Sequence, residues 1–173
     1  MRVVFDVDMA DVIAFNKHYI LESKAVKKSN VILLLICAVP FIISLIFGSG
    51  YSGFVFPILF LIFGIIYVFK LRSQILLRRA EKELSKPENI NAFGTFEMEF
   101  NDEEIKINES ELNTILKWNA IKRLDETPEY FFLYISSLNA YSIPKKKISA
   151  NETEELNVIF KKYFPGTINT FKK

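Results

Sequence analysis

VILLLICAVPFIISLIFG (Val31–Gly48) and GFVFPILFLIFGIIYVF (Gly53–Phe69) contain no charged residue, and the four residues between them contain none either. A helix rises about 1.5 Å per residue, so each run reaches roughly 26 to 27 Å, close to the hydrocarbon thickness of a bilayer, about 30 Å. Both runs are apolar on all sides, and the rest of the chain is too short to cover them and also form a domain. The sequence therefore predicts a two-helix transmembrane hairpin within residues 29–70, with spans at 31–48 and 53–69.

Positive charges on the flanks predict the orientation of this hairpin. Lysines and arginines stand before the first run and after the second: Lys24, Lys27, Lys28, Lys70, Arg72, Arg78 and Arg79. The connection between the runs carries no positive charge. By the positive-inside rule we expect both termini in the cytoplasm.

Composition narrows the class of protein further. The 173 residues are 50% hydrophobic and 24% charged, so the apolar residues must be segregated, and the net charge of +2 gives no reason to expect nucleic acid as a partner. Cys37 is the single cysteine, so an intramolecular disulfide is impossible.

The segments next to the hairpin have their own patterns. Residues 2–7 (RVVFDV) are typical of a short strand, and Asp8 is placed to cap a helix after it. We expect segment 1–28 to pack with the C-terminal domain; the alternative is a membrane-surface helix or partner site. Segment 71–88 is expected to continue the second span as a juxtamembrane helix that Pro87 stops.

Residues 89–173 predict a small cytoplasmic β domain. Apolar and charged residues alternate from Phe93, and turns separate expected strands near 93–100, 104–107, 112–118, 121–124, 130–135 and 140–143. Ser149 and Glu152 form a capping box at the start of a helix that carries Leu156 and Phe160 on one face. The expected fold class is thus an α+β membrane protein: the hairpin plus an antiparallel β roll closed by a C-terminal helix.

The segment LKWNAIKRLDETPEYFFLYISSLNAYSIPKKKIS (116–149), with the capped helix after it, resembles the C-terminal domain of YcxB-like proteins. The matching features are Trp118 with Ile121, Glu126-Thr127 before Tyr130-Phe131, Tyr134, and Ile143-Pro144-Lys145. The resemblance implies a bacterial, membrane-anchored protein with this layout along the whole chain. It also implies a pleckstrin-homology-like roll, and it assigns no functional residue.

No catalytic or metal-binding pattern stands out. His18 is the only histidine, which excludes histidine-based triads and the common zinc motifs, and there is no glycine-rich phosphate loop. Acidic residues gather at Glu97, Glu99, Asp102, Glu103 and Glu104. Strand alternation directs these outward, so we expect a solvated face rather than a calcium site. The sequence predicts no enzyme and no cofactor.

Lys145, Lys146 and Lys147 form the candidate binding site. They precede the helix N-terminus at Ser149, where an anion such as a lipid headgroup could use their charge and the free N–H groups. The alternative is a solvated basic loop that keeps a sheet edge from pairing. Trp118 is expected in the core, with a recognition platform as its alternative.

Together these patterns favour a membrane-anchored, cytoplasm-facing binding or regulatory module without catalytic activity. Its expected partners are the lipid bilayer, a protein partner and anionic lipid headgroups, and its expected location is the bacterial cell membrane. The alternative function is self-protection: an immunity protein against a toxin or bacteriocin.

Overall fold

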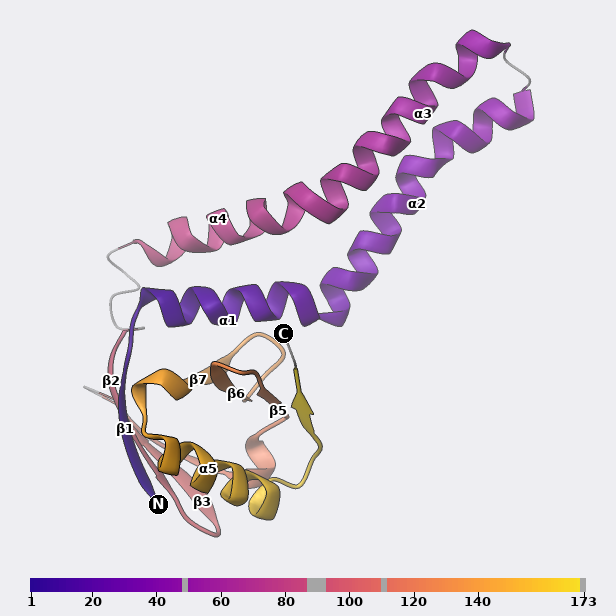
Figure 1. Ribbon diagram of the computed structural model, residues 1–173. Helices are drawn as coiled ribbons and strands as arrows, with labels where there is room; N and C mark the ends of the chain where they lie inside the picture. The colour runs from indigo at the N-terminus through magenta and orange to yellow at the C-terminus, as the bar shows by residue number, and fades with distance from the viewer. Residues whose placement is uncertain (48–49, 87–92, 110–111, 172–173) are drawn as a thin grey trace. The chain divides into compact units, whose positions relative to one another are not determined.

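The computed structural model describes residues 1–47, 50–86, 93–109 and 112–171 (Figure 1). The chain divides into two compact units, which we describe separately. The roll unit comprises Met1–Phe15 and Leu84–Lys173, and the hairpin unit comprises Asn16–Glu83. The predicted stop at Pro87, the domain start at residue 89, Gly48 and Ser49 at the hairpin tip, and Ser110 lie outside the described residues.

The first sheet of the roll unit joins the N-terminal strand to three strands that follow the hairpin in the chain. Its antiparallel order is β1-β2-β3-β4, with β1 at Arg2–Val7, β2 at Gly94–Phe100, β3 at Glu104–Asn108 and β4 at Asn113–Lys117. The alternation seen in the sequence decides which side chains turn inward, and the buried ones on the first three strands are Val3, Phe5, Val7, Met98, Phe100, Ile105 and Ile107. The strand predicted at 2–7 is thus formed, and it pairs with β2.

The second sheet has the order β7-β6-β5-β8. β5 is Arg123–Glu126, β6 is Tyr130–Tyr134, β7 is Ala140–Pro144 and β8 is Ile168–Thr170. β8 runs parallel to β5, whereas the sequence predicted only antiparallel strands. The strand expected at 121–124 begins at Arg123, because Trp118–Ala120 form a 3₁₀ turn, η3, that delays it.

Helix α5 (Ala150–Tyr163) packs against both sheets. Ser149 caps it through the predicted box: its side chain accepts from the N–H of Glu152, whose carboxylate accepts from the N–H of Ser149. Phe160 on the buried face meets the Phe100 ring of the first sheet and the Phe131 ring of the second edge to face, at 5.7 and 5.2 Å. The C-terminal helix thus fills the core of the roll, as the fold class requires.

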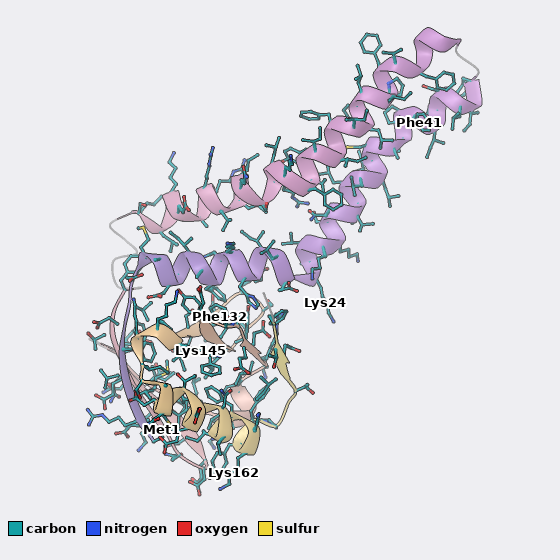
Figure 2. The ribbon with its side chains drawn as sticks, in the orientation of Figure 1. Met1, Lys24, Phe41, Phe132, Lys145 and Lys162 are labelled. Atoms are coloured by element: carbon teal, nitrogen blue, oxygen red, sulfur yellow. The ribbon has the colours of Figure 1, made fainter. Side chains whose placement is uncertain are left out.

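The start of helix α1 (Met9–Glu22) belongs to the roll unit. Asp8 caps it by accepting from the N–H groups of Ala10 and Asp11 at 2.8 and 3.1 Å. The ring centroid of Phe15 lies 5.7 Å from those of Phe132, which is labelled in Figure 2, and Tyr134 on the second sheet. Strand β6 is therefore covered on both of its faces, which explains its continuous burial.

The hairpin unit contains two helices that are long and apolar enough to cross a membrane, Lys24–Phe47 and Gly53–Leu84. The first is α2; the second comprises most of α3 (Tyr51–Ile66), a π-helical segment η1 (Tyr67–Leu71) and α4 (Arg72–Leu84). α2 and α3 run side by side, and Phe41 contacts Phe54 edge to face with 6.5 Å between ring centroids (Figures 1 and 2). Both predicted spans lie inside these helices, apart from residue 48.

A hydroxyl joins the two helices where a proline interrupts one of them. Pro57 has no N–H, so it cannot bond the carbonyl of Gly53 four residues earlier. The Ser44 hydroxyl on α2 lies 3.3 Å from this carbonyl oxygen and 3.0 Å from the carbonyl oxygen of Pro40. Ser44 is buried, and its hydroxyl lies within hydrogen-bonding distance of both carbonyl oxygens, so it can supply a donor in place of the missing N–H of Pro57.

Candidate functional site

The three lysines of the predicted anion site form a 3₁₀ turn, η4 (Lys145–Lys147), between β7 and α5. Each lysine meets a different carboxylate. Lys145 pairs with Glu126 at 2.7 Å and lies over the Phe131 ring, 4.2 Å from its centroid. Lys146 pairs with Glu129 at 3.0 Å and keeps a side chain that is 78% exposed. The turn is therefore internally neutralised rather than a block of uncompensated charge.

Lys147 belongs to a cluster at the start of α1, which we call the acid–lysine cluster: Asp8, Asp11, Tyr130 and Lys147. The lysine Nζ lies 2.6 Å from an oxygen of each aspartate. Tyr130 donates its hydroxyl to Asp11 at 3.0 Å, and the backbone N–H of Asp8 donates to Asp11 at 2.9 Å. The Asp11 side chain is only 4% exposed, so three donors compensate its burial.

The electrostatics of the cluster favour its charged and bonded form. The hydrogen bond from Lys147 lowers the pKa of Asp8 below its ordinary value. Two causes raise the pKa of Tyr130 to about 12: the larger is burial, and the second is the hydrogen bond to Asp11. Burial alone would lower the pKa of Lys147, but its bonds to Asp11 and Asp8 outweigh this effect and raise it. The cluster fastens the first turn of α1 to β6 and η4.

An anion at the lysine turn would have to compete with these carboxylates. At Lys147 it would face Asp8 and Asp11, and at the start of α5 the Glu152 carboxylate already accepts from the N–H of Ser149. Lys146 is the most exposed of the three lysines. Anion binding at this turn remains a prediction, and Lys146 is the residue best placed for it.

The other candidate residues of the sequence, Trp118 and the acidic group, make contacts that stabilise the fold. Trp118 is buried: its indole N–H donates to the carbonyl of Asn101 at 3.0 Å, and its ring stacks on Tyr163 with 5.8 Å between centroids. In the acidic group, Glu97 pairs with Arg2 at 2.7 Å. Within the described part of the chain, no three His, Cys, Asp or Glu side chains are grouped so as to hold a metal ion.

A second buried carboxylate, Asp125, could not be predicted from the sequence pattern. Its side chain is fully buried in β5 and is held by Arg123 in an ion pair whose first contact, from Nε to Oδ1, is 2.6 Å. Asn169 of β8 donates to the same carboxylate at 2.8 Å. The Arg123 guanidinium lies over the Tyr134 ring, 4.8 Å from its centroid. This group holds the parallel strand β8 against β5.

Comparison with known proteins gives a family for the middle of the roll unit. The model of the family described as YcxB-like protein matches residues 100–157, about a third of the chain. No curated protein and no solved structure matches the chain significantly. The likeness to pleckstrin-homology-like folds therefore stays a prediction. The matched segment runs from the end of β2 into α5, and over it the chain is similar to the YcxB-like family, as its sequence features indicated.

Proposed function

We propose that this protein is a membrane-anchored binding module without catalytic activity, in which the hairpin unit is the anchor and the roll unit, in the cytoplasm, is the recognition part. The observation that carries this proposal is the connectivity of the first sheet. Strand β1 precedes the two apolar helices, and its partner β2 follows them. The sheet is therefore connected to both ends of the hairpin, through β1 before it and β2 after it, and not through a single linker.

Exposed apolar side chains on the hairpin support the anchoring role. Both faces of α2 and α3 carry large apolar residues that no other part of the hairpin covers; Phe47 and Phe56 are 79% and 80% exposed. A water-soluble surface rarely leaves so large an apolar area uncovered, whereas hydrocarbon chains would cover it without cost. The positive residues at the foot of both helices support a cytoplasmic roll.

The free end of the first sheet is the surface that we propose for recognition. β4 is the last strand in the order β1-β2-β3-β4, so one of its edges is not bonded within that sheet. Ile115 on β4 and Leu112 just before it are 61% and 65% exposed. An extended segment of a partner protein can add to such an edge through backbone hydrogen bonds, while the apolar side chains select its residues. Pleckstrin-homology-like rolls are commonly recognition scaffolds, which agrees with this reading by analogy of fold.

Photo-crosslinking in native membranes tests this function on the full chain. A photoreactive amino acid at Ile115 should give a discrete crosslinked protein, while the same group at Val158, 64% exposed on α5, should not. Alkaline carbonate should leave the wild-type chain in the membrane pellet. Release of the chain by carbonate would contradict the anchor, and identical products at both positions would contradict the β4 surface.

A further inference from the structure

A pocket lies at the foot of the hairpin, where the apolar parts of its two arms end. It measures about 510 Å³ with its open side included. Apolar side chains, among them Val26, Val68 and Leu76, form much of its wall, and its polar lining includes Lys27, Asn30, Arg72 and Ser73. All of these residues belong to the hairpin unit. The lining of the pocket thus combines apolar side chains with two cationic side chains, Lys27 and Arg72.

Arg72 gives this pocket a positive charge that no carboxylate cancels among the residues described. Its guanidinium donates to Asn30 Oδ1, and through its second terminal nitrogen to Ser29 Oγ at 3.0 Å. Both acceptors are neutral. A guanidinium has five N–H donors in a fixed plane, so these two bonds orient Arg72 and leave further donors for a ligand.

Lys27 is a second cation on the lining of the pocket, but its charge is shared. Its Nζ lies 2.9 Å from Glu22, and its side chain is 57% exposed. The pair Lys27–Glu22 adds no net charge to the pocket. Because an exposed ion pair contributes little free energy, Lys27 can exchange Glu22 for the phosphate of a bound ligand. The pocket therefore offers one firmly held cation and one adaptable cation.

The position of the pocket along the helices selects the kind of anion. Val68 and Phe69 close the apolar stretch of the second arm, and Lys27 precedes the apolar stretch of the first. In a spanning hairpin this is the level of the lipid phosphates on the cytoplasmic side. Arg72 also follows directly on the π-helical segment η1, and such segments are frequent at functional sites.

We propose that this pocket binds an anionic phospholipid of the cytoplasmic leaflet, with its phosphate on Arg72 and Lys27 and its acyl chain along the apolar wall. Basic pockets between membrane helices bind anionic headgroups in this way. Arg72 is the main phosphate contact because a planar guanidinium bonds two phosphate oxygens at once. This inference rests on the proposed membrane anchor, and it adds a lipid preference to it.

Native mass spectrometry of the full chain in mild detergent tests the proposal with phosphatidylglycerol and phosphatidylcholine as probes. The wild-type chain should retain one phosphatidylglycerol in preference to phosphatidylcholine. Arg72→Gln should weaken the binding of phosphatidylglycerol by about tenfold or more, because a charge-assisted bidentate contact is lost. Lys27→Gln should weaken it less. The matched control is Arg78→Gln, which removes an exposed positive charge from the same helix without touching the pocket.

Four outcomes separate the explanations. Equal losses in Arg72→Gln and Arg78→Gln would overturn the site in favour of general attraction. Displacement of the lipid by an equal concentration of glycerol 3-phosphate would show a site for free phosphate instead. If circular dichroism shows that Arg72→Gln fails to fold, an unchanged lipid affinity in Lys27→Gln and Arg72→Lys would overturn the proposal. A chain that resists carbonate but shows no lipid preference refutes this inference alone, whereas a chain that carbonate releases refutes the anchor.

Discussion

Gly64 on α3 packs directly against the Cys37 side chain on α2. A Cβ atom placed on Gly64 would lie 2.6 Å from the sulfur and 2.8 Å from the Cβ of Cys37. Real Cβ atoms do not approach other atoms so closely, so the two helices touch here because residue 64 has no side chain. Cys37 is buried at this contact, which identifies it as a packing residue.

Gly64→Ala should therefore destabilise the hairpin, by about 1 to 3 kcal/mol, as overpacking usually does. Cys37→Gly in the same chain should restore part of this loss, because it removes the atoms that the new methyl group meets. Thermal unfolding in mild detergent measures both effects, and the coupling in the double-mutant cycle should be clearly above 0.5 kcal/mol. Gly50→Ala is the control, since nothing lies within 4 Å of the added atom; equal losses at both glycines would refute the close contact.

Lys147→Glu should weaken the roll unit far more than Lys146→Glu. A glutamate at 147 would face Asp8 and buried Asp11, so we expect a loss of about 3 to 5 kcal/mol, typical of a broken buried pair. At 146 the side chain is mostly exposed, and the change should stay within about 0.5 kcal/mol. Urea unfolding followed by the fluorescence of Trp118, the single tryptophan, gives both values. Similar losses in the two variants would mean that the cluster does not stabilise the fold.

The raised pKa of Tyr130 predicts a loss of stability at high pH. The folded chain keeps the phenolic proton up to about pH 12, while the unfolded chain releases it near pH 10. Folding therefore binds a proton between these values, so the contribution is complete below pH 10 and is lost as the pH rises toward 12. The difference in unfolding free energy between wild type and Tyr130→Phe should fall across this range. A constant difference would mean that the tyrosine titrates normally.

The proposed orientation predicts opposite labelling of two engineered cysteines. In a Cys37→Ala background, Ser52→Cys near the hairpin tip should react with an impermeant maleimide added to intact cells. Asn151→Cys at the start of α5 should react only after the cells are opened, because the roll unit would then be cytoplasmic. Labelling at 151 but not at 52 in intact cells would reverse the orientation.

Strand β1 should be needed for a stable roll. It buries Val3, Phe5 and Val7, each worth about 1.5 kcal/mol or more, so a chain of residues 89–173 should lose roughly 5 kcal/mol relative to one that also contains β1. Fusing residues 1–22 to residues 89–173 should raise the melting temperature and the solubility of the fragment. The measurement is thermal unfolding of the two fragments; identical melting temperatures would show that β1 contributes nothing to the sheet.

Local patterns made much of this fold predictable. β1 is rich in valine and phenylalanine, as strands are, and the Ser149–Glu152 box marks the start of α5, so both elements could be predicted from neighbouring residues. β8 has three residues and no usable alternation, and it forms only because β5 offers it a parallel edge. Trp118, at the start of the 3₁₀ turn, likewise donates its indole N–H to the carbonyl of Asn101, 17 residues away, a contact that neighbouring residues do not reveal.

The candidate site was less predictable because its partners are distant in the chain. Lys147 and Asp11 are 136 residues apart, and Asp125 and Asn169 are 44 apart. From the sequence alone Asp11 is one of two acidic residues in the helix Met9–Glu22, and the lysines are a run of unpaired charge. Only the pairing of β1 with β2 brings the start of α1 to the lysine turn.

The chain order of the first sheet also sets the order of events during synthesis. β1 leaves the ribosome first, and β2 follows only after both apolar helices have been made. At roughly 5 to 20 residues per second, the three apolar side chains that β1 buries wait on the order of 4 to 17 s for their partner strand. The first sheet cannot form before both apolar helices have been synthesised, so β1 is without its partner strand for the whole of that interval.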